Sequence, residues 1–219
     1  MGLVESEVSA GRAARYEGVY ASVGIHPNDL AEFEADPDGT MARLQQIATR
    51  NKVVGVGETG LDFYRERSSR DLQEAAFRAH IDLAKEVDRA LVIHCRDAHD
   101  EVLDVLHRAG PPERVVMHCF SGDDAFASVC VERGYFCSFA GNLTYKRNDD
   151  LRRTAARIPT KLLLVETDAP FLAPEPHRGR PNRPAFVRIT AERLASALGR
   201  EMTELEEKLE ANTRRAFGF

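Results

Sequence analysis

The feature that most constrains the fold of this chain is a series of short apolar runs, rich in Val, Ile and Leu, that alternate with amphipathic stretches. Such a run is typical of a parallel strand buried on both faces, and the alternation is that of successive β-α units. We expect six strands, at residues 19–25, 53–57, 91–94, 115–118, 135–139 and 162–166. The sequence therefore predicts an α/β fold with a parallel sheet.

The stretches between the runs have the spacing of helices. The clearest covers residues 69–87, where apolar residues recur every three or four positions after a capping Ser68 or Ser69. Further helices are expected at residues 184–198 and 203–216, the last opened by a capping box at Thr203 and Glu206. Six strands suit an open doubly wound sheet, whereas a closed β-α barrel normally has eight.

Composition sets the outer limits. The chain has 219 residues, of which 43% are hydrophobic, and we expect a single domain over residues 1–219. Its formal net charge of −5 excludes a global attraction to nucleic acid, so any such contact must come from a local patch. Without a secretory signal or an apolar run long enough for a membrane, a cytoplasmic protein is expected, with its four cysteines as free thiols.

Four of the apolar runs end in, or run directly into, a side chain that can bind a metal. These side chains are Glu58, His94, His118 and Asp168. In a β-α barrel the residue at the carboxyl end of a strand projects into the catalytic mouth, and two imidazoles with two carboxylates suit a divalent cation. The alternatives are that the histidines are structural and that the carboxylates cap the turns that follow.

Residues 55–60 also fit the dinucleotide-binding pattern G-x-G-x-x-G. That site needs a helix to begin at once, so that its N-terminus meets the pyrophosphate. Here Leu61-Asp62-Phe63-Tyr64 follows instead, and Glu58 would place a negative charge beside the phosphates. We expect no dinucleotide site.

Several motifs together resemble one family. They are V-G-I-H-P at residues 23–27, G-E-T-G-L-D-F at 57–63, I-H-C-R-D-A at 93–98, H-C-F-S-G at 118–122, E-T-D-A-P-F-L at 166–172 and H-R-G-R-P-N-R-P at 177–184. In this order, and over essentially the whole chain, they resemble the TatD family of metal-dependent deoxyribonucleases.

The resemblance implies a TIM-type (β/α)8 barrel that hydrolyses phosphodiester bonds of DNA, typically from a 3′ end or in single strands. It implies two divalent ions, Mg²⁺, Mn²⁺ or Zn²⁺. Glu58 would bridge them, His94 and His118 would bind one ion, and Asp168 would bind the other and assist the attacking water. A bound divalent cation makes water acidic and offsets charge on the phosphate, so no nucleophilic side chain is needed.

One departure from the family concerns its first strand, which carries a His-x-His pair that this chain lacks. Comparison with the family suggests that Met1 falls after the second strand, which gives a barrel incomplete at its N-terminus with about six strands. Either the start is misplaced or the chain is a true remnant. In the latter case the open barrel edges predict self-association, because unpaired strand edges attract further strands.

Substrate contacts are expected from His26, by resemblance, and from Arg96, Arg178, Arg180 and Asn182. The three arginines at positions 178, 180 and 183 lie in a Pro-rich loop and can grip backbone phosphates, although a solvated surface loop is an equal alternative. Phe63, Tyr64 and Phe120 are candidates for stacking on an unpaired base, or for packing. The alternative functions are a metal-dependent amide or ester hydrolase, and a catalytically impaired remnant that binds nucleic acid or a partner.

Overall fold

The computed structural model describes residues 1–219, which form two compact units. Unit 1 contains residues 1–116 and 216–219, and unit 2 contains residues 117–215. The expectation of a single domain over residues 1–219 stays a prediction. Each unit contains parallel strands with helices packed on them, so the predicted α/β class is confirmed.

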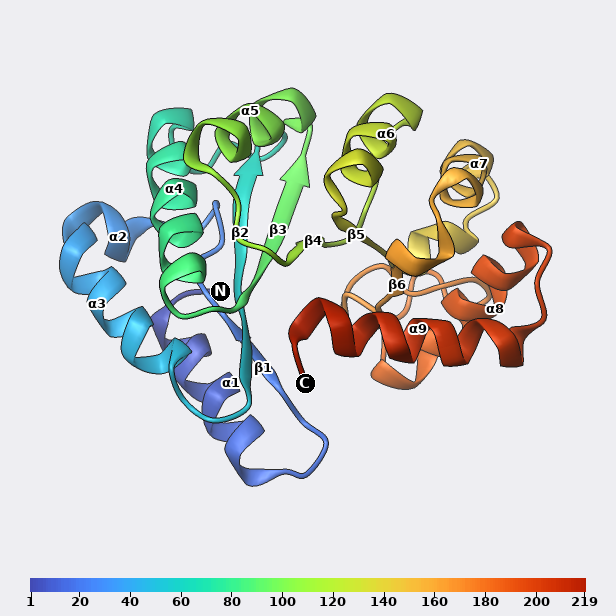
Figure 1. Ribbon diagram of the computed structural model, residues 1–219, viewed down its shortest axis with the longest axis horizontal. Helices are drawn as coiled ribbons and strands as arrows, with labels where there is room; N and C mark the ends of the chain where they lie inside the picture. The colour runs from blue at the N-terminus through green and yellow to red at the C-terminus, as the bar shows by residue number, and fades with distance from the viewer. The chain divides into compact units, whose positions relative to one another are not determined.

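Unit 1 consists of three complete strands and five helices. In chain order these are α1 (Leu3–Arg15), β1 (Ala21–Val23), α2 (Ala31–Ala35), α3 (Pro37–Ala48), β2 (Val53–Asp62), α4 (Arg70–Glu86), β3 (Ala90–Arg96) and α5 (His99–Ala109). β2 pairs in parallel with both β1 and β3, and the arrows of β2 and β3 run side by side in Figure 1. α1 packs on β1, and α3 and α4 pack on β2.

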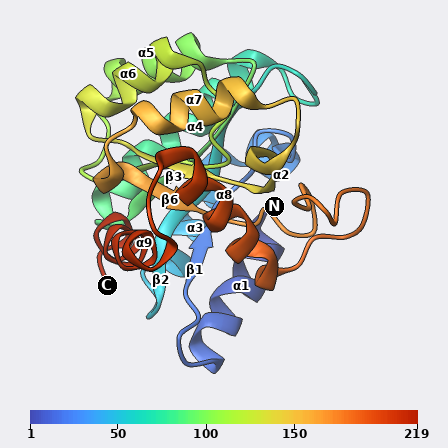
Figure 2. The ribbon, with the colours of Figure 1, turned by 90° about the vertical axis from the view of Figure 1, so that its right-hand side faces the viewer.

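Unit 2 follows β4 (Val115–Met117), at which the chain passes from one unit to the other. Its elements are α6 (Asp124–Arg133), β5 (Phe136–Phe139), η1 (Gly141–Thr144), α7 (Asp149–Arg157), η2 (Thr160–Leu162), β6 (Leu163–Val165), η3 (Pro184–Phe186), α8 (Val187–Leu198) and most of α9 (Met202–Phe217). β5 and β6 are parallel. Before η3 the chain forms a long loop without helix or strand, orange in Figure 2.

All six predicted strands are confirmed, but two were predicted too short, and β3 spans Ala90–Arg96 where residues 91–94 were expected. The run at residues 53–57 continues as β2 to Asp62, because its glycines allow an irregular strand instead of ending it. The predicted helix at residues 69–87 is α4, with Ser69 Oγ accepting a hydrogen bond from the Leu72 N–H at 3.3 Å. The capping box at Thr203 was wrong, because α9 begins at Met202 and Thr203 lies within it.

The chain just after β1 comes unusually close to β2 where two glycines face each other. A Cβ atom added to Gly24 would lie 2.7 Å from the Cα of Gly57, which no side chain tolerates without movement. The Ser6 hydroxyl of α1 fixes Gly24 further, since it donates to the Gly24 carbonyl at 3.2 Å and accepts from the Gly24 N–H at 3.1 Å. The close contact between the main chains of Gly24 and Gly57 therefore fixes the position of the residue that precedes Glu58.

A buried histidine ties α4 to the segment that follows β1. His80 is fully buried, and its Nε2 accepts a hydrogen bond from the Ile25 N–H at 3.0 Å. Its Nδ1 therefore carries the proton and donates to the Ala76 carbonyl at 2.7 Å. Burial lowers the pKa of His80 to about 4, so the ring is neutral at pH 7.

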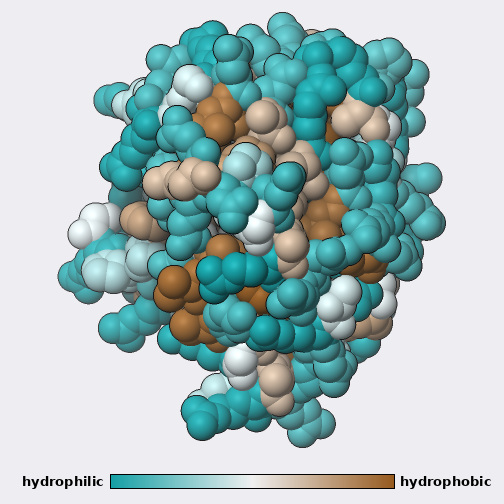
Figure 3. Space-filling model, turned by 90° about the vertical axis from the view of Figure 1, so that its left-hand side faces the viewer, coloured by the Kyte–Doolittle hydropathy of each residue, from teal (hydrophilic) through white to brown (hydrophobic).

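The apolar core of unit 1 includes a cluster formed by Ile25, Leu30, Phe33 and Ala76. The surface is mostly hydrophilic on the face drawn in Figure 3, with apolar side chains gathered in small patches. All four cysteines are free thiols, as predicted. No helix combines the length and the apolar character that crossing a bilayer requires.

Candidate metal centre

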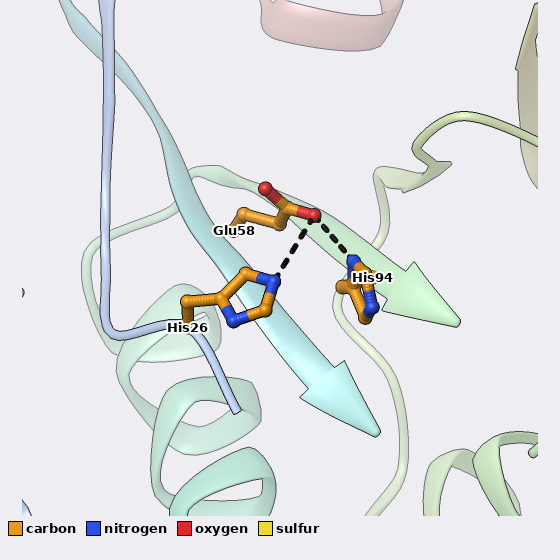
Figure 4. A group of neighbouring side chains, drawn as sticks. All are labelled: His26, Glu58 and His94. Carbon is orange, nitrogen blue, oxygen red and sulfur yellow. Dashed lines mark hydrogen bonds and ion pairs between the residues drawn. The ribbon is translucent and has the colours of Figure 1, made fainter. Parts of the chain in front are cut away.

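Three side chains of unit 1 come together as a group that can hold a metal ion. They are His26, Glu58 and His94, and one ligand atom of each lies within 4.8 Å of the others (Figure 4). Oε1 of Glu58 is the common neighbour, 2.6 Å from Nδ1 of His94 and 3.8 Å from Nε2 of His26. The three residues come from the loop after β1, from β2 and from β3.

Glu58 reaches this group from an irregular point in β2. The register of β2 against β3 shifts between Val56 and Thr59, and Gly57 has a φ of +140°, a conformation that other residues rarely adopt. The local signal for this was the G-V-G-E-T-G stretch, because glycines inside a strand pattern often mark a bulge or a close approach of two main chains.

A second carboxylate, which the sequence analysis missed, holds the other side of His94. Asp62 is only 1% exposed, and its Oδ2 lies 3.2 Å from Nε2 of His94 and accepts a hydrogen bond from the Asn28 side chain at 2.7 Å. Burial alone would raise the pKa of Asp62, but hydrogen bonds from the Arg65 N–H and Asn28, together with His94, hold it below its usual value. The signal was an aspartate after Leu61 at the end of the strand.

His94 therefore lies between two carboxylates, one at each ring nitrogen. A neutral imidazole has one N–H and one lone pair, so when Nε2 donates to ionised Asp62, Nδ1 has no proton to offer Glu58. Two acceptor atoms 2.6 Å apart repel each other unless a cation lies between them or near them. Either a proton or a metal ion must fill that role, and a carboxylate with an imidazole is a suitable donor set for a divalent metal.

His26 has a different hydrogen-bonding state from His94. Its Nδ1 accepts a hydrogen bond from the Asn28 N–H at 3.1 Å, so in the neutral ring the proton is on Nε2, which faces Glu58. Burial, followed by the nearby His94, lowers the pKa of His26 to about 4. At pH 7 His26 is thus a neutral N–H donor.

Unit 2 holds a second group with the same chemistry. Nδ1 of His118 lies 2.9 Å from Oε1 of Glu166, and Nε2 lies 3.7 Å from Oδ1 of Asp168. His118 follows β4, and both carboxylates follow β6, so all three stand at carboxyl ends of strands. Asp168 has a left-handed φ of +55°, and the turn that it begins is closed by a hydrogen bond from the Phe171 N–H to its carbonyl at 2.8 Å.

Glu166 is the second residue that the sequence analysis missed. Its Oε2 accepts a hydrogen bond from the Cys119 N–H at 3.2 Å. Its Oε1 is buried and, although close to His118, is reached by no hydrogen bond of good geometry. A buried carboxylate oxygen in this state is costly without a cation, so this group also fits a metal ion. The signal was its position as the first acidic residue after the last apolar run.

The four predicted ligands are thus found as two pairs, Glu58 with His94 in unit 1 and His118 with Asp168 in unit 2. Of the expected substrate residues, Arg96 lies at the end of β3 and Arg178 lies over the ring of Tyr145, its guanidinium carbon 4.5 Å from the ring centroid. Arg180 is exposed. Asn182 is buried, and its side-chain amide donates to the carbonyls of Thr167 and Phe171 at 2.6 and 2.7 Å.

The β2 segment also bears on the rejected dinucleotide site. Residues 53–62 are strand throughout, so no helix begins after the G-x-G-x-x-G pattern. Phe120, one of the three candidate stacking residues, is 2% exposed and packs against Phe126 and Phe139. It is a core residue.

Comparison with known protein families places this geometry in context. The family described as TatD related DNase matches residues 4–218. A Mycobacterium tuberculosis protein described as the uncharacterized metal-dependent hydrolase TatD is 40% identical over 214 residues, which cover 95% of this chain and 80% of that protein. A Klebsiella pneumoniae protein described as 3′-5′ ssDNA/RNA exonuclease TatD is 35% identical over 223 residues, which cover 99% and 84%.

A solved structure shows the same fold. The crystal structure of YJJV, a TatD homolog from Escherichia coli K12, matches with a TM-score of 0.89 and 32% sequence identity, over 97% of this chain and 82% of that one.

Proposed function

Because this chain belongs to the TatD related DNase family of metal-dependent hydrolases, we propose that it hydrolyses phosphodiester bonds at the 3′ ends of single-stranded or frayed DNA. The observation that carries the proposal is the position of His94 between Glu58 and Asp62. That arrangement calls for a cation beside a carboxylate and an imidazole, which are the donors that a metal-dependent hydrolase needs.

We assign the metal-binding roles within each unit separately. In unit 1, Glu58 and His94 are the proposed ligands, and Asp62 orients the His94 ring by accepting a hydrogen bond from its Nε2–H group. In unit 2, His118 and Asp168 are the proposed ligands, with Glu166 beside them. A bound divalent cation lowers the pKa of water and neutralises charge on phosphate oxygens.

Each unit also contains groups that can bind a phosphate. His26 presents an N–H donor beside Glu58, which suits a non-bridging phosphate oxygen, and it stays neutral at pH 7 because its pKa is about 4. Arg178 and Arg180 offer fixed positive charge in the exposed loop of unit 2. This charge favours a phosphate ester over a neutral amide. Asn182 stabilises the loop, because its buried side-chain amide donates hydrogen bonds to two backbone carbonyls.

The experiment is a nuclease assay on purified protein with single-stranded oligonucleotides labelled at the 5′ or the 3′ end. We expect stepwise shortening from the 3′ end with Mg²⁺, Mn²⁺ or Zn²⁺ and none in chelator. Cleavage that persists in chelator would refute the mechanism. A 5′-to-3′ ladder would refute the assigned polarity.

A matched pair of variants tests the ligand assignment. Glu58→Gln keeps the size of the side chain and removes its charge, so we expect loss of activity together with weaker metal binding, measured by competition with a chromophoric chelator. Glu17→Gln, an exposed change of the same kind in unit 1, is the control. Glu58→Gln with normal turnover and normal metal affinity would show that the Glu58 carboxylate does not hold the metal ion.

A further inference from the structure

Tyr64 is a large aromatic side chain that remains exposed beside the candidate metal centre of unit 1. It lies in the turn that follows β2, and it is 64% exposed. Its neighbour Phe63 is only partly exposed and has the Arg70 guanidinium over its ring, 4.0 Å from the centroid. Of the three aromatic residues considered for base stacking, Tyr64 is therefore the one that is mostly exposed.

One face of the Tyr64 ring is covered by a guanidinium group. The guanidinium carbon of Arg96 lies 3.9 Å from the ring centroid, which is the distance of a cation-π contact. A flat ring with an arginine behind it is held in place at low cost in conformational freedom, since Tyr has only two rotatable side-chain bonds. Because Tyr64 is 64% exposed even with Arg96 in this position, we infer that the opposite face can receive another flat group.

The backbone that carries this pair is fixed by the residues of the metal centre. Oδ1 of Asp62 accepts hydrogen bonds from the N–H groups of Tyr64 at 3.1 Å and Arg65 at 2.9 Å, while its Oδ2 contacts His94. In addition, the Phe63 N–H donates to the Arg96 carbonyl at 2.9 Å. The same carboxylate therefore sets the position of His94 and of the Tyr64 turn.

Arg96 is also on the side of the sheet that bears the ligand. Alternate residues of a strand point to the same face, and Arg96 is two residues after His94 in β3. Arg96, with the Tyr64 ring against its guanidinium group, therefore lies on the same surface as His94. A nucleotide whose phosphate is at His94 would have both side chains nearby.

We propose that Tyr64, supported by Arg96, is a stacking platform for an unpaired base, and that it makes this enzyme selective for single-stranded ends. The proposal rests on the proposed function, because it names the part of the substrate that lies beside the scissile phosphate. A base inside a duplex has both faces covered by its neighbours, so it cannot lie on Tyr64 without leaving the stack. An unpaired base at a strand end loses few stacking and pairing contacts when it moves onto Tyr64.

The experiment measures stacking directly and without hydrolysis. Full-length protein in chelator is titrated into a single-stranded oligonucleotide that ends in 2-aminopurine at its 3′ terminus, whose fluorescence is quenched when the base stacks. We expect quenching by the wild type and its loss in Tyr64→Ala, together with about 10-fold weaker binding. Tyr64→Phe keeps the ring and should keep the quenching. Tyr16→Ala, which removes another exposed tyrosine of unit 1 (54% exposed), is the control.

A second oligonucleotide separates stacking from a change in fold. With an abasic 3′ terminus, the wild type and Tyr64→Ala should bind equally, because no base is present to stack. Three results would each overturn the proposed platform. They are an equal loss of affinity for both oligonucleotides in Tyr64→Ala, the absence of quenching by the wild type at saturation, and normal quenching by Tyr64→Ala.

Failure of the platform and failure of the proposed function give different results. If quenching depends on Tyr64 but the protein cleaves no DNA when metal is added, the stacking platform is supported and the proposed nuclease function is refuted. If metal-dependent cleavage is equally fast on single-stranded and blunt duplex ends and is unchanged in Tyr64→Ala, the nuclease function is supported and the stacking platform is refuted.

Discussion

The buried histidine of α4 makes the stability of this protein depend on pH in a way that can be calculated. Nε2 of His80 accepts the Ile25 N–H and its Nδ1 donates to Ala76, so a proton added to Nε2 must displace the Ile25 hydrogen bond inside the core. The unfolded chain takes up that proton readily, since its histidines titrate near 6.5. His80→Gln removes the titration while keeping an acceptor for the Ile25 N–H.

The magnitude follows from the difference between the two pKa values. The folded value is about 4 and the ordinary value is 6.5, so protons bind the unfolded state more tightly throughout the interval between them. His80 therefore supports the fold fully above about pH 6.5, and the support is lost as the pH falls toward about 4. The complete loss is about 3 kcal/mol, of which about 2 kcal/mol has occurred at about pH 5.

The assay is urea unfolding at about pH 7.5 and at about pH 5. The chain has no Trp, so far-UV circular dichroism and tyrosine fluorescence are the probes, and their transitions must coincide. We expect the free energy of unfolding to fall between these pH values by about 2 kcal/mol more in the wild type than in His80→Gln. His107→Gln, on the exposed side of α5, should behave as the wild type.

An equal loss of unfolding free energy in His80→Gln and the wild type between the two pH values would contradict a neutral, buried His80. That result would mean that His80 is protonated in the folded state near its ordinary pKa, or that the core opens to admit water around it. Other groups that titrate in this range, His26 among them, contribute equally to both proteins and cancel in the comparison.

Three further predictions concern single residues. Asp62→Asn should lower the affinity of unit 1 for a divalent metal about 10- to 100-fold with an unchanged circular dichroism spectrum, and unaltered chelator competition would contradict its role in orienting the ligand. Ser69→Ala should cost about 1 kcal/mol in urea unfolding because it removes the N-cap of α4, and an unmoved midpoint would show that the cap contributes nothing. Gly24→Ala should cost about 1–3 kcal/mol and also reduce the proposed nuclease activity, because its Cβ meets the Gly57 main chain; a stable and fully active variant would show that the two segments separate easily.

The strands were predictable because a strand buried on both faces has to be apolar at nearly every position. The carboxyl end of β2 was not predictable, because Gly57 and Gly60 look in the sequence like residues that end a strand. In the fold a Cβ at Gly57 would lie 2.2 Å from the carbonyl oxygen of Val92, and one at Gly60 would lie 2.1 Å from that of His94. These glycines are there to let β3 approach, and that is a property of the pairing and not of the local sequence.

The candidate site was predictable only in part for a related reason. Glu58 and His94 stand out individually, but that Asp62 lies against His94 depends on the pairing of β2 with β3, in which Asp62 is opposite Arg96. Likewise, Glu166 lies beside His118 although the two are far apart in sequence. Spacing identifies residue types that bind metal, whereas the carboxylates that orient them are defined by which strands are neighbours.

The contact between Gly24 and Gly57 limits how the proposed catalytic carboxylate can be engineered. Because main chain touches main chain there and both residues are already glycine, a larger residue at either position would force the strands apart and could not move Glu58 by a small step. Protein designers who wish to retune this site, for a larger ion or a bulkier ester, therefore have to work from the opposite wall, through the side chains carried by β3 and by the loop after β1.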